Sequence, residues 1–259
     1  MVALDRMKSQ VRRYPRLWDR LKAVKRFAEI RSDPGYKFLD RFSKVVNRPV
    51  IFIQVGANDG LRNDPIREFV VRDKWSGVFV EPIPAVFELL KSNYSYLNHG
   101  LHFLCAAVGN QGGGSLEIYA FCEEFLKSLP EEERLNYLRK ASCDIEHVKK
   151  FVRPQHAQHI VKTTVPVVSL SEIAADVLKT KAVDIVVVDA EGYEEKIIMG
   201  IDFKRLNPTA IFFESHHLRK QEQEHLFGYL GQHGYWMETI GGASVAVKAE
   251  IAGQVKNAR

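Results

Sequence analysis

Short, nearly continuous apolar runs alternate with helical patterns along the chain from residue 50 onward. The first run, PVIFIQVG, is typical of a strand buried on both faces, because hydrophobic residues occupy successive positions. Runs of this kind predict strands at residues 50–55, 77–81, 101–106, 184–189 and 210–214. Helical stretches separate several of them, at residues 65–73, 85–94 and 194–200. Such alternation predicts that the five strands pair in parallel.

The end of the chain has the pattern of a hairpin. Residues 218–232 have helical periodicity, and two β-rich runs, 235–240 and 243–248, follow on either side of a Gly241-Gly242 turn signal. We therefore expect a doubly wound, Rossmann-like α/β sheet of five parallel strands extended by a C-terminal antiparallel hairpin. With 46% hydrophobic residues among 259, the chain has enough apolar material for one such domain.

A basic amphipathic helix is predicted ahead of the sheet. Between Val11 and Ile30, apolar residues recur at spacings of three and four, with Arg and Lys between them. This helix either attaches to an anionic membrane face, a partner or a negatively charged carrier of the substrate, or packs on the core with its basic face in water. We expect residues 1–48 to form a helical extension and residues 49–259 to form the main domain.

A long insertion, residues 109–180, separates the third and fourth predicted strands. It is too long for a plain connection, and it forms either a lid over the substrate or a contact in a homodimer. Its H-A-Q-H motif places His156 and His159 at a helical spacing. Because no Cys or acidic third ligand stands nearby, we expect a polar helix face there rather than a zinc site.

The net charge of +5 and the isoelectric point near 9.0 raise the question of a nucleic-acid partner. Residues 1–50 hold 14 Lys and Arg against five Asp and Glu, so the rest of the chain is mildly acidic and we expect no nucleic acid. The cysteines, Cys105, Cys122 and Cys143, form no C-x-x-C pair, which favours free thiols in a reducing cytoplasm. With no secretion signal and no run of 18 apolar residues, we expect a cytoplasmic protein without a membrane span.

The clearest local motif is QVGANDG, which begins at Gln54, where the first buried strand ends. Glycine at Gly56 and Gly60 would let a ligand approach the backbone closely, and Asn58 and Asp59 offer hydrogen bonds to its polar groups. The motif lacks the full G-x-G-x-x-G spacing of a pyrophosphate binder, which argues against NAD.

An acidic residue, Glu81, ends the second predicted strand 21 residues after Gly60, and Pro82 would help to fix the exit of the chain. A carboxylate at this strand end matches the two hydroxyls of a ribose, and its charge disfavours a 2′-phosphate. The pairing of Glu81 with the glycine motif therefore predicts an adenosine-type cofactor.

Four segments, QVGANDG, FVEPIP, AAVGNQGGGSLEIY and VVVDAEGYEEKIIMG, together resemble the FkbM family of methyltransferases over about Ile51 to His217. The resemblance implies the class I methyltransferase sheet and methyl transfer from S-adenosylmethionine to a hydroxyl of a sugar, glycan or secondary metabolite. It also implies a place for each residue of the cofactor site: Gly56, Asn58, Asp59 and Gly60 at the methionine end, Glu81 at the ribose, and Ala106 and Ala107 at the adenine edge.

The DAEGYE segment follows the fourth predicted strand and resembles the family's D-x-E-G-x-E, so it should lie where the methyl donor and acceptor meet. Asp189 would contact the cofactor's amino group, orient the acceptor or bind a metal. Asp189 and Glu191 are candidate catalytic residues. Glu191 and Glu194 stand near a helix N-terminus, where helix capping is the simpler role for Glu194.

The fifth predicted strand ends in FFESHHL, which should bring Glu214 close to Asp189. The family's E-x-H pattern favours His216 as the base that removes the acceptor's proton, with His217 as the substitute. As an alternative, Asp189 and Glu214 would hold Mg²⁺, which would acidify a bound hydroxyl.

Two other classes of protein remain open on the sequence. An NAD-linked oxidoreductase would explain the parallel sheet and Glu81, but it needs a pyrophosphate loop. A non-catalytic module that binds nucleic acid or an anionic surface would depend on the basic N-terminal segment instead. Among methyltransferases, DAEG stands where many amino-group enzymes have N-P-P-Y or D-P-P-Y, which favours oxygen over nitrogen as the acceptor atom.

Overall fold

A computed structural model of the chain describes residues 32–61, 64–138, 140–150, 152–180, 182–216 and 218–258. The basic helix expected between Val11 and Ile30 lies outside the described residues, as does His217. Within the described part, no helix is long and apolar enough to cross a lipid bilayer. Cys105, Cys122 and Cys143 are free thiols, as the sequence predicts.

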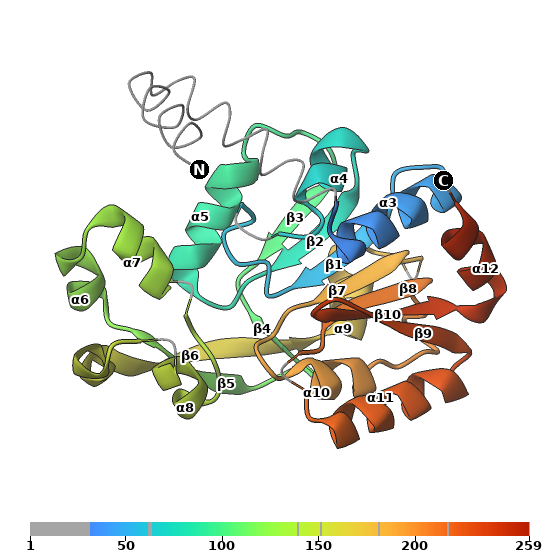
Figure 1. Cartoon of the computed structure of the whole chain (residues 1–259). Helices are drawn as coiled ribbons and strands as arrows, with labels where there is room; N and C mark the ends of the chain where they lie inside the picture. The colour runs from blue at the N-terminus through green and yellow to red at the C-terminus, as the bar shows by residue number, and fades with distance from the viewer. Residues whose placement is uncertain are drawn as a thin grey trace, which may run out of the picture.

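The core of the molecule is a seven-stranded sheet in the order β3-β2-β1-β7-β8-β10-β9 (Figure 1). Its strands are β1 (Ile51–Val55), β2 (Ser76–Val80), β3 (Leu101–Leu104), β7 (Ile185–Val188), β8 (Ala210–Glu214), β9 (Tyr235–Ile240) and β10 (Ala243–Lys248). The first five pair in parallel, whereas β10 runs antiparallel to both β8 and β9. This confirms the expected α/β class, including the C-terminal hairpin.

Two layers of helices cover the sheet because successive strand residues point to opposite faces. Phe52 belongs to one apolar cluster and its neighbour Ile53 to the other, and both are fully buried. The helices with residues in the first cluster are α3 (Pro34–Val46), α4 (Arg67–Arg72), α5 (Pro84–Tyr94) and α12 (Ala249–Asn257). Those in the second are α9 (Leu170–Glu172), the short π-helix η2 (Ile173–Val177), α10 (Glu194–Met199) and α11 (Lys220–Gln232).

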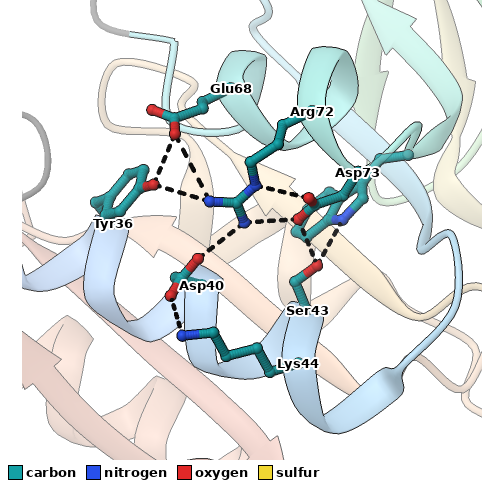
Figure 2. Close-up of polar contacts among 8 residues, drawn as sticks. Tyr36, Asp40, Ser43, Lys44, Glu68, Arg72 and Asp73 are labelled. Carbon is teal, nitrogen blue, oxygen red and sulfur yellow. Dashed lines mark hydrogen bonds and ion pairs between the residues drawn. The ribbon is translucent and has the colours of Figure 1, made fainter. Parts of the chain in front are cut away.

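Helix α3, within the segment expected as an extension, packs into the first cluster through Leu39 and Phe42 and is also tied to α4 by polar contacts. The Arg72 guanidinium donates to Asp40 at 2.8 Å, to Asp73 at 2.6 Å and to the Tyr36 hydroxyl at 3.2 Å (Figure 2). These contacts raise the pKa of Arg72, chiefly through Asp73. Apolar packing and this ion-pair cluster together hold α3 on the sheet.

Residues 107–169, which include most of the predicted insertion 109–180, form a second, three-stranded sheet in the order β4-β6-β5 with a group of short helices beside it (Figure 1). The elements of this region are β4 (Ala107–Gly109), β5 (Ser115–Phe121), α6 (Glu123–Ser128), α7 (Glu131–Leu138), α8 (Ile145–Lys150), the 3₁₀ helix η1 (Pro154–His159) and β6 (Ile160–Ser169).

The H-A-Q-H motif in η1 has a packing role. The His156 ring forms a 2.7 Å hydrogen bond with the Tyr137 hydroxyl, and the His159 ring stacks on Phe125 with a centroid distance of 4.3 Å.

Candidate functional site

A pocket opens where β1, β2 and β7 end side by side, at the carboxyl edge of the parallel sheet. The lining includes polar side chains, those of Asn58, Glu81 and Asp189. It also includes apolar side chains from the start of α5 and from the insertion: Ile83, Val86, Leu116, Ile118 and Leu138. Ligands bind at such strand ends in open α/β sheets, so the pocket stands where the sequence predicts a cofactor.

The glycines of QVGANDG serve the packing of the chain on itself. Gly56 has φ +71°, and a Cβ atom there would lie 1.7 Å from the carbonyl oxygen of Asp189. Gly60 has φ +62°, and its Cβ would collide with side chains of Leu90 and Tyr94 at 2.6 and 2.4 Å. Protein atoms thus fill the space that a Cβ would need at each glycine, while Gly56 itself lines the pocket and Gly60 does not.

Two backbone hydrogen bonds fix the carboxylate of Glu81. Asn58 adopts a left-handed backbone conformation, φ 51°, and its N–H donates to the Glu81 carboxylate at 3.0 Å. A second backbone N–H, that of Ile83, donates to the other carboxylate oxygen at 3.0 Å. The carboxylate is therefore held at the wall of the pocket with both of its oxygens in fixed positions.

Burial raises the pKa of Glu81 to about 7, and the nearby charges of Asp189 and Asp59 act in the same direction. The two backbone hydrogen bonds favour the ionised form and offset part of this shift. Glu81 therefore titrates close to neutrality, and each of its oxygens keeps a lone pair for a further donor such as a sugar hydroxyl.

Most of the predicted cofactor residues share this one pocket. The lining includes these seven of them: Gly56, Asn58, Glu81, Pro82, Ala106, Ala107 and Asp189. Asp59 and Gly60 are not on the lining, and Asp59 instead shapes the turn by accepting a hydrogen bond from the Leu61 N–H at 3.1 Å. The apolar wall was not predicted, because its members lie far apart in the sequence and no local pattern marks them.

A group of three carboxylates lies at the ends of β7 and β8. Asp189, Glu194 and Glu214 each place one oxygen within 4.8 Å of the others. The fully buried Glu194 carboxylate accepts the backbone N–H groups of Ala190 at 2.8 Å and Gly192 at 3.0 Å, so it has the capping role that the sequence favours.

The carboxyl groups of Asp189 and Glu214 lie close together, with one oxygen of each within 4.8 Å of the other. Burial raises the pKa of both groups, and the negative charge of Glu191 adds to the effect. Because Glu194 is committed to the backbone, this group leaves only two carboxylates for the Mg²⁺ alternative, which is an incomplete set of ligands.

A second pocket adjoins the first, and Ala141 and Glu191 line both. Glu214 and His216 form one side of it, with His216 Nδ1 3.2 Å from the Glu214 carboxylate and its side chain 51% exposed. Lys140 and His147 come from the insertion and line the other side. The structure thus brings Asp189, Glu214 and His216 close together, as predicted. It also adds Lys140 and His147, which no sequence motif indicates.

The chain matches the family model described as the methyltransferase FkbM domain over residues 54–237. No curated protein matches it. Among solved structures, it is similar to an FkbM methyltransferase from Methylobacillus flagellatus KT (12% identity, TM-score 0.48) over 77% of this chain and 43% of that chain. It is also similar to a precorrin-6y C5,15-methyltransferase from Geobacter metallireducens (13% identity, TM-score 0.36) over 78% of this chain and 82% of that chain. A third similar structure is the plantazolicin methyltransferase BpumL in complex with SAH (10% identity, TM-score 0.40), over 83% of this chain and 82% of that chain.

These structural likenesses are too weak to carry an argument, and the chain spans less than half the length of the Methylobacillus protein. The strand order, observed directly, establishes the fold. The family model covers more than half of the chain, and its match begins at the glycine motif and extends beyond the strand-end carboxylate Glu214. The chain therefore belongs to the FkbM methyltransferase family.

Proposed function

We propose that the protein transfers a methyl group from S-adenosylmethionine to a hydroxyl oxygen of a sugar, glycan or secondary metabolite. The observation that carries this proposal is the junction of the two pockets. Asp189 lines the first pocket and has a carboxylate oxygen within 4.8 Å of one of Glu214, which lines the second, while Glu191 lines both. A donor in the first pocket and an acceptor in the second would therefore meet at these carboxyl groups.

The lining of the first pocket offers the kinds of group that the proposed cofactor needs. Glu81 offers two fixed carboxylate oxygens to a ribose, as a vicinal diol requires. Ala107, Ile118 and Leu138 supply an apolar wall for an adenine ring, and Asn58 and Asp189 supply polar groups for an amino-acid end. S-adenosylmethionine, when bound, supplies a methyl group on a sulfonium that is already strongly activated.

The residues of the second pocket would then align the acceptor and manage its proton. An alcohol is a weak acid, so a nearby base is needed during transfer. His216 is exposed to the pocket and lies 3.2 Å from Glu214, which can stabilise the imidazolium that forms when the ring takes a proton. Burial raises the pKa of Asp189 and Glu214, so a carboxyl group there can hold a proton and donate a hydrogen bond, which suits the orientation of a hydroxyl group.

The acceptor class follows from the polar character of this pocket. Glu191, Glu214, His147 and Lys140 offer both donors and acceptors, as a hydroxylated ligand needs. The competing NAD hypothesis lacks support, because the family is one of methyltransferases.

Calorimetric titration with S-adenosylmethionine, S-adenosylhomocysteine and NAD tests the cofactor, and saturable binding of the two adenosyl ligands alone is expected. Transfer of radiolabelled methyl groups to a panel of methyl glycosides of hexoses and deoxyhexoses tests the acceptor class. Preference for NAD would refute the proposed cofactor, and methylation of amines in place of hydroxyl groups would refute the acceptor atom.

A further inference from the structure

A contact between the insertion and the DAEGYE loop has no counterpart in the sequence prediction. The Nε2 atom of His147, on α8, lies 3.0 Å from the Glu191 carboxylate, on the loop that follows β7. The His147 side chain is 16% exposed and that of Glu191 is 43% exposed, so the contact is shielded on the side of the insertion. Residues 44 positions apart are thereby joined at the pocket wall.

The backbone of Glu191 needs such a restraint. Its φ is +51°, a left-handed conformation that is strained for a non-glycine residue and persists only where the surroundings impose it. The Glu194 carboxylate fixes the neighbouring N–H groups of Ala190 and Gly192. His147 holds the side chain of Glu191, so both the backbone beside this residue and its side chain are restrained.

The place of Glu191 gives this contact its meaning. Glu191 and Ala141 line both pockets, and His147 lines the second beside them. Release of Glu191 from His147 would move the shared wall at the junction where donor and acceptor must align. Methyl transfer depends on in-line alignment of the reacting atoms, so small displacements there have large effects on rate.

We propose that His147 is a positioning residue of the acceptor site, which acts through its bond to Glu191 and holds the insertion against the catalytic loop. This inference rests on the proposed function for its effect on turnover. The bond itself is tested without any acceptor. The membership of the chain in the FkbM methyltransferase family does not depend on this inference.

The experiment compares full-length wild type with His147→Ala and His147→Gln, because a glutamine amide can still donate to Glu191. The control is His225→Ala: His225 forms a similar 2.9 Å pair with Glu195 between α11 and α10, away from both pockets. Hydrogen exchange is measured for peptides that cover residues 140–150 and 185–193, a range that excludes Glu195, the partner of the control residue. The dissociation constant of S-adenosylhomocysteine is measured by calorimetry.

In His147→Ala, we expect exchange in both peptides to accelerate about tenfold or more, as for the loss of a hydrogen bond to a charged group. His147→Gln should restore most of the protection, and His225→Ala should leave it unchanged. The cofactor product should bind within about twofold of wild type in every variant, because His147 does not line the first pocket. For a methyl glycoside that the wild type methylates, the acceptor KM should rise about tenfold in His147→Ala.

Unchanged exchange in His147→Ala would overturn the inference, as would an equal loss of protection in the glutamine variant. If His147→Ala both weakened the binding of S-adenosylhomocysteine and lowered the melting temperature, the inference would also be overturned, because His147 would then serve the fold as a whole. Failure of wild type to bind S-adenosylhomocysteine would instead contradict the proposed function, while the exchange data would still decide the role of the bond.

Discussion

Glu81→Gln tests the cofactor site most directly, because the substitution keeps the shape of the side chain and removes one acceptor oxygen. In wild type, two backbone N–H groups fix the carboxylate, and each oxygen can also accept a hydroxyl of a ribose diol. Glutamine has a single acceptor oxygen, so it can accept a hydrogen bond from only one of the two ribose hydroxyls. Loss of one hydrogen bond to a charged group is worth about 1.5–3 kcal/mol, which predicts about 10- to 150-fold weaker binding of S-adenosylhomocysteine at pH 8.

The same variant changes how stability depends on pH. Folding raises the pKa of Glu81 from 4.5 to about 7, so the folded state binds the proton more tightly than the unfolded state. Ionisation therefore destabilises the fold progressively as pH rises from about 4.5 to 7, by about 3 kcal/mol in all. Glutamine has no such penalty, but it leaves one backbone N–H without its acceptor, at a cost of about 1–3 kcal/mol.

Urea unfolding at pH 5 and pH 8 measures this effect, and calorimetry at pH 8 measures binding. Glu81→Gln should be clearly less stable than wild type at pH 5 and close to it at pH 8. The control is Glu88→Gln on helix α5, whose side chain is 67% exposed and lies outside the pocket; it should change neither quantity. Binding of S-adenosylhomocysteine within threefold of wild type by a folded Glu81→Gln would refute the assignment of Glu81 to the ribose.

Three further predictions concern other parts of the molecule. Gly56→Ala should lower the free energy of unfolding by about 3 kcal/mol or more in a urea titration, because its Cβ would lie 1.7 Å from the Asp189 carbonyl oxygen at φ +71°. Asp189→Asn should remove the titratable carboxyl group beside Glu214 and reduce kcat at least about tenfold, with a changed pH–rate profile as the diagnostic. Arg72→Ala should cost about 1–2 kcal/mol of stability in urea, since Asp73 and Asp40 each lose an ion-pair partner, yet leave the affinity for S-adenosylhomocysteine unchanged.

The sequence predicts the sheet well because the signal for each strand is local. A buried parallel strand needs hydrophobic residues on both faces, and the run IVVV of β7 satisfies this within four residues. The positions of Glu81, Asp189 and Glu214 follow from the same runs, since each residue stands at or just after a strand's carboxyl end. Helix α12 was not predicted, because short amphipathic patterns at a chain end are weak signals.

Contacts between distant segments account for what the sequence could not predict. From the sequence, Gly56 was explained by the close approach of a ligand. In the structure, the atom nearest to the position of a Cβ there is the carbonyl oxygen of Asp189, just after the adjacent strand β7. His147 and Lys140 carry no motif, and they reach the site only because the insertion folds back over the strand ends. Side-chain chemistry alone does not reveal such a residue until the tertiary fold brings it to the pocket.

This division between strand ends and insertion bears on specificity. The polar residues of the first pocket, Asn58, Glu81 and Asp189, follow the carboxyl ends of β1, β2 and β7. The sheet itself therefore positions them. The second pocket takes one wall from the same strand ends, through Glu214, and the opposite wall from the insertion, through Lys140 and His147. Substitutions in the insertion can therefore alter acceptor recognition while the carboxylates that face the cofactor stay in place. Exchange of residues 140–148 for another sequence should change which glycosides are methylated and preserve the binding of S-adenosylhomocysteine.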